Sequence, residues 1–598
     1  MNMHKIGFIN IKNYRLCREV SLPLEGFTPL VGQNNTGKSS ILAALAWVLK
    51  PYALQVSDFA EAGRPIEVSA RIDGITAEVL DQIPDGRHRA AIEPFCRDGS
   101  IWIRAHTTGT TARAITQEIY DHEQYIGEGI PESWRAFPTG LPQAVGALLP
   151  DPLQINAMDD IGEDLGKAKA GSTIKALLDE IMEPILQAHV ELTEALTAIR
   201  RVLTTGGEAR SQHLSDFDRA ASNALAHFFP GLNLELDLQV IEAKEFFKAG
   251  DLIVTDSSTG DRRRFDQLGT GAQRAIQMAL IRHLADLRTT AQAGVARRLL
   301  LIDEPELYLH PQAVRRLRQA LETLSKTGFQ VVYSTHSPLM LSRENAADTI
   351  IVGKQREVGT FTRLPLRQAV PSALQEAEAQ SRTLFELGNL SEIYFSERVV
   401  LCEGKTDRRL LPLAYEALYG RHPELDQITF VSVGSCSDIP KALPVLAAMG
   451  INACAFADLD FAFTDARKGQ RSLLPKEDEQ LNTAKSILQR LQAEHGFPLG
   501  GNGLPTKDKN TGWQAADTWA CFAKDAEGVE VVRLIQQALK EQGIWVWAAG
   551  CIEHVTGHLD KGEDAIQMQE LAIGQLTTAQ VDKQMPAFRE CFEWMQAR

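Results

Sequence analysis

The sequence predicts an α/β protein of at least two domains, and three observations support this. An apolar run at residues 27–31 ends in a glycine-rich loop, and a stretch with helical spacing follows it. Later apolar runs at 299–302 and 331–335 end in polar residues, as buried parallel strands do. The chain has 598 residues, too many for one core, and the pattern of apolar runs ending in acids recurs after residue 398.

Composition is ordinary for a globular protein, with 44% apolar and 23% charged residues. No apolar run approaches the ~20 residues that cross a membrane, and the first residues lack the apolar segment of a secretion signal. The eight cysteines form no C-x-x-C pair, which favours reduced thiols in a cytoplasm and argues against a zinc site. Because the net charge is −15, DNA contact requires a local patch or metal ions in an acidic site.

The glycine-rich loop fits the pattern G-x-x-x-x-G-K-[ST]. A strand, such a loop and a helix start direct backbone N–H groups and the positive helix end at one point. Lys38 is expected to reach the β- and γ-phosphates, and the Ser39 hydroxyl to ligate Mg²⁺. A chance glycine turn is the alternative, but strand, loop and helix in register disfavour it. The sequence therefore predicts a nucleoside triphosphate site that contains Gly32, Asn35, Gly37, Lys38, Ser39 and Ser40.

The elements after the loop are predicted in chain order. Residues 6–11 are predicted to form an opening strand, and alternation at 67–73 and 101–104 predicts strands of an antiparallel layer beside the phosphate loop. Residues 123–171 carry many Gly and Pro residues and are interpreted as connecting structure. Helical spacing from 172 to 203, interrupted at Pro184, predicts a helical insertion.

Two further strands follow the predicted insertion. Every second residue from Leu232 to Val240 is apolar, which predicts a half-buried strand. A strand at 252–254 leads to the basic run 262–264. Three adjacent arginines are usually a solvated loop, and DNA contact is the alternative.

Three later segments complete the first site. Residues 265–274 open an amphipathic helix with small residues at its start, where backbone donors can meet an anion. The strand at 299–302 ends in Asp303, placed to hold Mg²⁺, and Glu304, which can polarise the attacking water. The strand at 331–335 delivers His336. A histidine there is more often structural, but its order after the other motifs favours a role at the site.

The order of these motifs resembles that of the ATP-binding-cassette (ABC) type of ATPase. The motifs are the phosphate loop, L-G-T-G-A-Q, L-L-L-I-D-E-P-E-L-Y-L-H-P and S-T-H-S-P. The E-P-E-x-x-L-H-P continuation is similar to its RecF- and SMC-like DNA-repair and defence branch. The resemblance implies that two heads sandwich ATP, with Gly269 and Gly271 of one facing the phosphate loop of the other, and that His336 senses the γ-phosphate. The signature departs from L-S-G-G-Q at Gly269 and Thr270.

A second chemical centre follows a polar segment at 375–381. An apolar strand at 398–402 leads to Glu403, and a later strand at 453–457 ends at Asp458 and Asp460. In extended geometry these two aspartates share a face, so that both can ligate one ion. Carboxylate oxygens suit Mg²⁺ or Mn²⁺, and a hard cation among acids is what phosphodiester hydrolysis needs.

An E-G-x-x-D strand end followed by D-x-D after another strand resembles the Toprim fold of topoisomerases, primases and some nucleases. The resemblance implies that Glu403 is a metal ligand or general acid–base. It also implies that Asp458 and Asp460 are metal ligands and that Asp407 is a further ligand.

Glu553 follows a strand that begins at Ile544 and looks like the G-[DS]-[IL]-E element of nuclease-type Toprim domains, with Cys551 in place of the usual polar residue. A distal lysine completes such sites in the family. Lys583 and Lys561 are both candidates, and Lys583 is preferred for its distance from Glu553.

An ABC-type P-loop ATPase head with an inserted helical dimerisation segment, followed by a C-terminal Toprim domain, is the architecture of the OLD (overcoming lysogenization defect) family. This family includes the nuclease subunit of Gabija-type defence systems. The expected domains are the ATPase at 1–165 and 213–375, the helical insertion at 166–212 and the Toprim domain at 385–598.

The resemblance implies an ATP-hydrolysing, metal-dependent DNA endonuclease in anti-phage defence. It would be a cytoplasmic homodimer or higher oligomer that uses ATP and Mg²⁺, or Mn²⁺ at the Toprim site. A helicase or a retron reverse transcriptase complex is an expected partner, and a membrane is not. The alternative is an ATP-switched DNA-binding scaffold that assembles a partner and does not cut.

Overall fold

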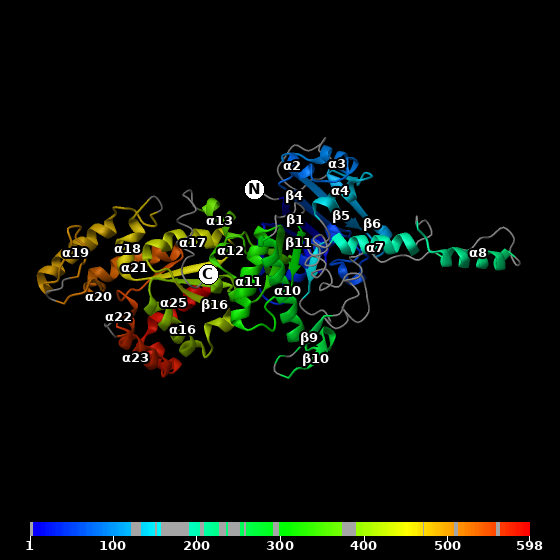
Figure 1. The fold of residues 1–598 in the computed structure, drawn as a ribbon. Helices are drawn as coiled ribbons and strands as arrows, with labels where there is room; N and C mark the ends of the chain where they lie inside the picture. Colours follow the sequence, from blue (N-terminus) through cyan, green and yellow to red (C-terminus); the bar gives the residue numbers. More distant parts are fainter. Residues whose placement is uncertain are drawn as a thin grey trace. The chain divides into compact units, whose positions relative to one another are not determined.

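The computed structural model describes residues 4–120, 133–149, 152–156, 190–203, 209–226, 235–236, 252–255, 257, 259–290, 298–373, 390–469, 472–507, 512–557 and 562–598. These residues divide into two compact units. Unit 1 contains Met1–Leu30, Gly37–Met340 and Lys354–Phe361, and unit 2 contains Val31–Thr36, Leu341–Gly353 and Thr362–Arg598. Figure 1 colours the chain from blue at the N-terminus to red at the C-terminus.

The first sheet of unit 1 is antiparallel, with the strand order β2-β1-β4-β5-β6-β7. This confirms the strands predicted at 6–11, 67–73 and 101–104. Alternate residues of β4, among them Val68, Ala70 and Ile72, are fully buried, and β4 contacts the helix that follows the phosphate loop. The strands are β1 (Lys5–Tyr14), β2 (Cys17–Pro23), β4 (Ile66–Asp73), β5 (Ser100–Thr107), β6 (Ile115–Tyr120) and β7 (Trp134–Ala136).

Four strands of a second sheet lie in the order β3-β12-β11-β8: β3 (Phe27–Val31), β12 (Phe329–Thr335), β11 (Arg298–Ile302) and β8 (Leu153–Ile155). β11 pairs in parallel with both β12 and β8. Every residue of β12 is buried, so its apolar residues do not alternate with exposed ones, as expected for a strand covered on both faces. The carboxyl ends of β11 and β12 carry Asp303 and His336 to the same edge of the sheet.

The prediction of connecting structure at 123–171 is wrong for part of the described residues. β7, α4 (Leu141–Leu148) and β8 all lie there. A three-residue strand such as β8 is too short for a period to appear in the sequence.

The helices of unit 1 include those predicted after the phosphate loop and at the small residues 269–272. The predicted helix after the phosphate loop is α1, and the predicted glycine-led helix is α10, which contacts α11. The predicted insertion is described only at its end, as α7, and residues 172–189 lie outside the described residues. Within the described residues, the helices of unit 1 are α1 (Lys38–Leu49), α2 (Ala77–Leu80), α3 (Gly86–Ile92), α4, α7 (Val190–Leu203), α8 (Gln212–Ala226), α10 (Thr270–Thr290) and α11 (Pro311–Lys326).

A small hairpin precedes α10. β9 (Ile253–Thr255) pairs antiparallel with β10 (Arg262–Arg264), and all three arginines are exposed. This confirms the predicted strand at 252–254. Most of the strand predicted from Leu232 to Val240 lies outside the described residues, and Leu236 within them is 37% exposed. β13 (Ile350–Gln355) and β14 (Gly359–Thr362) come later in the chain.

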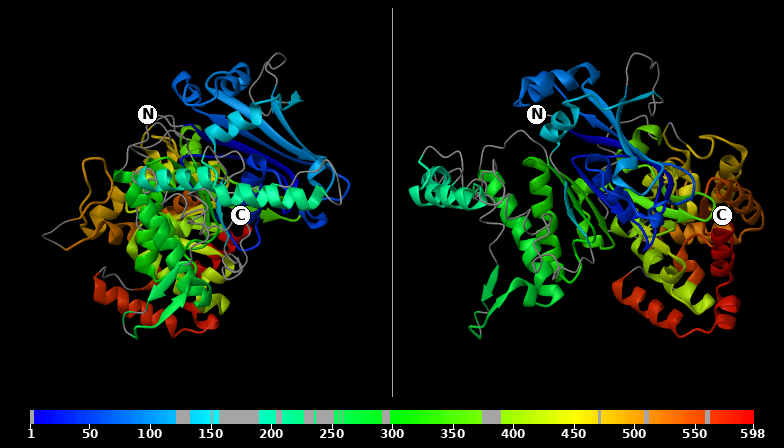
Figure 2. Two further views of the ribbon diagram at one scale, coloured as in Figure 1. Left: turned by 45° about the vertical axis from the view of Figure 1, so that its right-hand side comes forward. Right: turned by 90° about the vertical axis from the view of Figure 1, so that its right-hand side faces the viewer.

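The central sheet of unit 2 is parallel, with the order β16-β15-β17-β18. Val399 and Leu401 of β15 pack into one apolar cluster together with residues of α17, α19 and α21. Val400 and Cys402 pack into another, with residues of α16 and α25. Figure 2 gives two further views of this sheet and its helices, in yellow to red. Covered on both faces, the sheet can offer chemistry only at its strand ends and edges.

The strands of this sheet are β15 (Arg398–Cys402), β16 (Ile428–Ser432), β17 (Asn452–Ala457) and β18 (Ile544–Val546). The helices in the described part of unit 2 are α12 (Arg343–Ala346), α13 (Leu366–Ala373), α15 (Leu390–Tyr394), α16 (Lys405–Tyr419), α17 (Ile439–Ala448), α18 (Leu459–Phe463), α19 (Glu479–His495), α20 (Ala515–Lys524), α21 (Ala526–Glu541), α22 (Ile552–Thr556), α23 (Glu563–Gly574), α24 (Thr578–Gln584) and α25 (Pro586–Ala597). Among the described residues, no helix combines the length and the apolar character needed to cross a bilayer.

Candidate functional site

The phosphate loop has the backbone that its glycines predict. Gly32 and Gly37 have φ angles of 147° and 108°, in the region that favours glycine, and Asn35 has a φ of 62°. A Cβ on Gly37 would lie 2.4 Å from Thr360 Oγ1, and one on Gly32 would lie 2.1 Å from Val352 O. Side chains are therefore excluded at both positions, and α1 begins directly after Gly37.

Lys38 opens α1 and is only 5% exposed. Burial lowers the pKa of its ammonium, whereas the nearby carboxylates of Glu304, Asp303 and Glu306 oppose that shift. Ser39, one position on, shares a cavity of about 450 Å³ with Asp303, with Gln154 of β8 and with Asn156, which follows β8. Ser40 is buried in the first turn of α1. The structure thus brings Ser39 and Asp303, the two residues predicted to hold Mg²⁺, to one cavity.

The end of β11 is held by a buried arginine that no sequence motif singled out. Arg274, 1% exposed on α10, donates from Nη2 to the carbonyl oxygens of Asp303 (2.8 Å) and Glu304 (3.0 Å). The hydroxyl of Ser334 donates to the Asp303 carboxylate and accepts from the backbone N–H of Glu304 at 3.0 Å. Glu304 itself has a φ of 46°. Both acids are therefore fixed at their main chain as well as by their strand.

His336 lies beside Glu304, with Nε2 3.5 Å from Oε1. Its backbone N–H donates to Oε1 of Glu306 at 2.9 Å, and the Thr335 hydroxyl donates to the same oxygen at 2.6 Å. Burial lowers the pKa of His336, and the Lys38 charge lowers it further. Burial raises the pKa of Glu304, and Asp303 and Glu306 add to that rise. The pair is therefore biased toward a neutral imidazole and a basic carboxylate.

The two glycines predicted to act across a dimer lie at the start of α10. A Cβ on Gly269 would meet open space, and one on Gly271 would lie 3.6 Å from Cβ of Tyr308. The Gln273 side chain donates to the carbonyl of Phe265 at 2.9 Å and fixes the turn that precedes the helix. Neither glycine is among the residues that line the cavity of Ser39 and Asp303.

In unit 2, three of the predicted acids meet at the ends of neighbouring strands. Glu403 follows β15 and Asp458 follows β17, and these strands pair in parallel. The backbone N–H of Asp458 donates to Oε2 of Glu403 at 3.1 Å. Carboxylate oxygens of Glu403, Asp458 and Asp460 all lie within 4.8 Å of one another. An all-oxygen group of this size fits a hard divalent cation.

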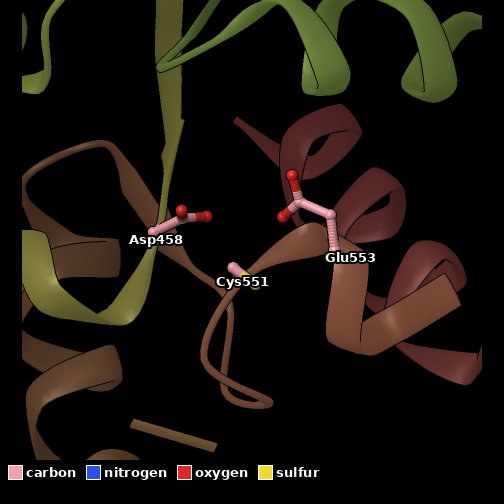
Figure 3. A group of neighbouring side chains, drawn as sticks. All are labelled: Asp458, Cys551 and Glu553. Atoms are coloured by element: carbon pink, nitrogen blue, oxygen red, sulfur yellow. The ribbon is translucent and has the colours of Figure 1, made fainter. Parts of the chain in front are cut away.

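Asp458 also belongs to a second group, with Cys551 and Glu553, whose ligand atoms again lie within 4.8 Å of one another. Figure 3 shows the carboxylates of Asp458 and Glu553 directed toward one another, with Cys551 between them. Two backbone hydrogen bonds join the strand ends: Leu459 N donates to Gly550 O at 2.7 Å, and Trp547 N donates to Ala457 O at 3.1 Å. Because Cys551 stands where the resembling element usually has a polar residue, this second group contains a sulfur atom.

One cavity of about 740 Å³ contains both groups. It is lined by Glu403, Asp458, Asp460, Pro505, Thr506, Lys507, Gln514, Ala515, Ala516, Asp517, Trp519, Gly550, Cys551, Glu553 and His554. Its lysine is Lys507, which sequence reasoning did not single out. Lys583 is exposed in the last turn of α24 and does not line the cavity, and Lys561 lies outside the described residues.

Asp407 lies behind these groups, on the first turn of α16 and 4% exposed. Its Oδ1 accepts a hydrogen bond from Nε1 of Trp547 at 3.2 Å. Burial raises the pKa of Asp407 to about 6, the Trp547 hydrogen bond opposes the rise, and Glu553 adds to it. Asp407 is a member of neither ligand group within the described residues.

Cys551 has a further partner that the sequence did not reveal. Its Sγ lies 2.8 Å from Nδ1 of His554, and Nε2 of that histidine lies 3.6 Å from Oδ1 of Asp517. Burial raises the pKa of the Cys551 thiol, and Asp458 and Glu553 raise it further. The spacing of three positions between a cysteine and a histidine at a helix start could have indicated this contact. Asp517 lies on α20, so no local spacing indicates its contact with His554.

Comparisons with known proteins match both halves of the chain. The family described as "Overcoming lysogenization defect protein-like, TOPRIM domain" matches residues 394–460, the AAA ATPase domain family matches 4–83, and an AAA domain family described with the AbiEii toxin matches 179–342. The Old nuclease of Escherichia phage P2 is 31% identical over 562 residues, which cover 92% of this chain and 93% of that protein. The OLD nuclease of Thermus scotoductus is 26% identical over 509 residues, which cover 81% of this chain and 87% of that protein.

Among solved structures, the Smc head domain from Pyrococcus furiosus matches with 16% identity and a TM-score of 0.35, over 62% of this chain and 98% of that one. A likeness of this size supports no further conclusion.

Proposed function

This chain belongs to the OLD (overcoming lysogenization defect) family of nucleases, and on that premise we propose that it is an ATP-regulated, metal-dependent DNA endonuclease. Its ATPase and Toprim domains, together with its nuclease relatives, make it a nuclease with ATPase activity. The proposal adds which residues act, which ions they bind and how the two halves cooperate.

The observation that carries the proposal is the meeting of Glu403, Asp458 and Asp460 at the ends of β15 and β17. Three half-buried carboxylates so close together repel one another unless a cation compensates their charge. The oxygen-only donor set fits Mg²⁺ or Mn²⁺, and such an ion, when bound, neutralises a scissile phosphate and activates water. The 740 Å³ cavity leaves room for a segment of nucleic acid backbone beside the acids.

Each residue of the Toprim site has a distinct task in this proposal. Asp458 and Asp460 hold the cation. Glu403 holds it or moves a proton at the reacting oxygen, and the Asp458 N–H keeps its carboxylate in place. Lys507 lines the cavity and supplies a positive charge for the phosphate, and so takes the place of the distal lysine for which Lys583 was preferred over Lys561. Glu553, 2% exposed, extends the acidic group through Asp458, which belongs to both sets of ligand atoms.

In the ATPase site, the phosphate loop and Lys38 bind the triphosphate, while Ser39 and Asp303 hold Mg²⁺ through the cavity that they share. Glu304 accepts the proton of the attacking water. His336, kept neutral by its surroundings, contacts Glu304 and reports the γ-phosphate. We further propose that ATP joins two copies of the chain, with Gly269 and Gly271 of one copy against the triphosphate in the other.

We propose anti-phage defence as the biological setting. The alternative is an ATP-switched DNA-binding scaffold that assembles a partner and never cuts. One variant distinguishes these two functions. If the protein is a nuclease, Glu403→Ala loses both DNA cleavage and protection of the cell against phage, whereas a scaffold with this substitution still protects the cell.

The proposal is tested by incubating the protein with supercoiled and linear DNA, in Mg²⁺ or Mn²⁺, with and without ATP. Cleavage lost in Glu403→Ala but kept in Glu416→Gln, an exposed glutamate on α16, supports the Toprim nuclease. Lys38→Ala then gives the sign of the control by ATP. Cleavage that survives Glu403→Ala contradicts the assignment of the site. If no DNA is cut, copurification of a helicase or a reverse transcriptase complex decides whether a partner is missing.

A further inference from the structure

The Toprim cavity contains two groups of ligand atoms that differ in chemistry. One offers only carboxylate oxygens, from Glu403, Asp458 and Asp460, and the other replaces one carboxylate by the sulfur of Cys551. Asp458 belongs to both. An all-oxygen group prefers Mg²⁺ or Mn²⁺, whereas thiolate selects softer ions of the zinc class.

We propose that Asp458, Cys551 and Glu553 form a subsite for one thiophilic divalent cation of the Zn²⁺ class, next to an oxygen-only subsite for Mg²⁺ or Mn²⁺. The inference rests on the proposed function, because it gives the metal site of that function two subsites of different selectivity. It reverses the expectation, drawn from the lack of a C-x-x-C pair, that the cysteines bind no zinc.

Burial and geometry support a ligand role for the thiol. Cys551 and Glu553 are 1% and 2% exposed, and the two backbone hydrogen bonds between the strand ends fix them relative to Asp458. The ligand atoms are therefore assembled before any ion arrives. A preorganised site of this kind loses less freedom on binding than a site on a mobile loop.

His554 and Asp517 complete the arrangement around the sulfur. An N–H at Nδ1 of His554, 2.8 Å from Sγ, can donate to a thiolate, and Asp517 lies on the other side of the ring at 3.6 Å. When a cation binds, the S–H proton of Cys551 is released to solvent and the sulfur keeps its electron pair for the ion. Groups that orient a ligand in this way commonly change metal affinity ~10–100-fold.

The same three residues, in the order Cys551, His554 and Asp517, also resemble a nucleophilic triad. A nucleophilic thiolate requires positive surroundings and access to substrate. Here the thiol is 1% exposed and lies between the carboxyl groups of Asp458 and Glu553. Those acids disfavour a thiolate alone and favour one that shares a cation with them.

The other cysteines provide matched controls. All eight are free thiols. Cys436 is half-buried and near Glu403 and Asp460 of the oxygen-only group, but its Sγ lies 3.0 Å from Asp465 Oδ2, and it belongs to neither ligand group of the described residues. Cys521 is half-buried on α20 and does not line the cavity.

The test titrates the full chain with Co²⁺ and follows sulfur-to-cobalt charge-transfer absorption. We expect a band that saturates at one ion per chain, is displaced by Zn²⁺ and persists in excess Mg²⁺. It should disappear in Cys551→Ser, remain in Cys436→Ser and Cys521→Ser, and need ~10–100-fold more Co²⁺ in His554→Gln. No band in the wild-type chain, or a band that survives Cys551→Ser, overturns the proposal.

Two measurements keep this result separate from the nuclease assignment. ATP hydrolysis and circular dichroism of Cys551→Ser show whether the variant still folds. The band requires no turnover, so a chain that cuts no DNA but shows a Cys551-dependent band refutes the nuclease and keeps the subsite. A chain that cuts DNA but shows no such band supports the nuclease and refutes the sulfur-containing subsite.

Discussion

Nε2 of His336 lies 3.5 Å from Oε1 of Glu304, and the two residues follow adjacent parallel strands. Their surroundings move the two pKa values toward each other: burial and neighbouring acids raise that of Glu304, while burial and Lys38 lower that of His336. A glutamate with a raised pKa is a better proton acceptor for water than an exposed one. The pair thus links the acid that would activate water to a residue that would contact the γ-phosphate.

Glu304→Gln should slow ATP hydrolysis by ~10²–10⁴-fold, the usual contribution of a general base. ATP affinity should remain close to that of the wild-type chain, because Lys38 and the phosphate loop are unchanged. Single-turnover hydrolysis and equilibrium binding of ATP measure the two effects separately. Glu78→Gln, on the exposed surface of α2, is the matched control. A hydrolysis rate equal to that of the control would remove Glu304 from the mechanism.

The raised pKa of Glu304 gives the same substitution an effect on stability. Because folding raises this pKa, its stabilising contribution is complete below the pKa of the unfolded chain and is lost as the pH rises through the folded value. Glutamine does not titrate. The unfolding midpoint of Glu304→Gln relative to the wild type should therefore increase from pH 4 to pH 8, as scanning fluorimetry can record. A difference that is constant or falls with pH contradicts this sign.

Arg274→Lys should impair the ATPase although it conserves the charge. Lysine has one nitrogen, whereas Nη2 of Arg274 bonds the carbonyl oxygens of Asp303 and Glu304 while Nη1 bonds that of Asn156. Leaving buried acceptors without donors costs about 1–3 kcal/mol, so the unfolding midpoint should fall along with the hydrolysis rate. Arg316→Lys, an exposed position on α11, provides the control. Unchanged hydrolysis in Arg274→Lys would show that the end of β11 keeps its geometry without the hydrogen bonds of Arg274.

The sequence predicted the motif-bearing elements well because each combines a buried strand with a polar end. β11, β12, β15 and β17 were all found from apolar runs a few residues long. Residues that act through distant contacts were not found. Arg274 reaches Asp303 across 29 positions and Trp547 reaches Asp407 across 140, and no local pattern encodes such pairs. Lys507 was missed because it lies on an irregular segment after Leu504, where neither period nor motif marks it.

Trp547→Phe should weaken the Toprim site without touching the cavity. The indole N–H donates to Asp407 at 3.2 Å, and its loss leaves a buried carboxylate with one donor fewer. The pKa of Asp407, already raised by burial to about 6, should rise further. Mg²⁺-dependent cleavage should fall ~10–100-fold, as for other residues that support metal sites. Cleavage as a function of Mg²⁺ concentration measures the change, and Trp513→Phe, which does not line the cavity, is the control.

Lys507→Ala and Lys583→Ala decide which lysine serves the Toprim acids. Both lysines are exposed, but Lys507 lines the cavity of Glu403 and Glu553, whereas Lys583 lies on α24 outside it. An exposed charge acts on a phosphoryl group strongly only at short range, because solvent and salt screen it over distance. We therefore expect Lys507→Ala to lower the rate of DNA cleavage ~10²–10³-fold, as the loss of a transition-state charge partner does elsewhere. Lys583→Ala should stay within about two-fold of the wild type, as expected for a screened surface charge.

The comparison of Lys507→Ala with Lys583→Ala needs a control for the change in net charge. Lys476→Ala removes an exposed lysine of the same unit that does not line the cavity, so it corrects for the change in net charge. A large loss in Lys583→Ala with a normal Lys507→Ala would return the role to the sequence-based choice. It would also require α24 to approach the acids when DNA binds, since α24 contributes no residue to the cavity lining.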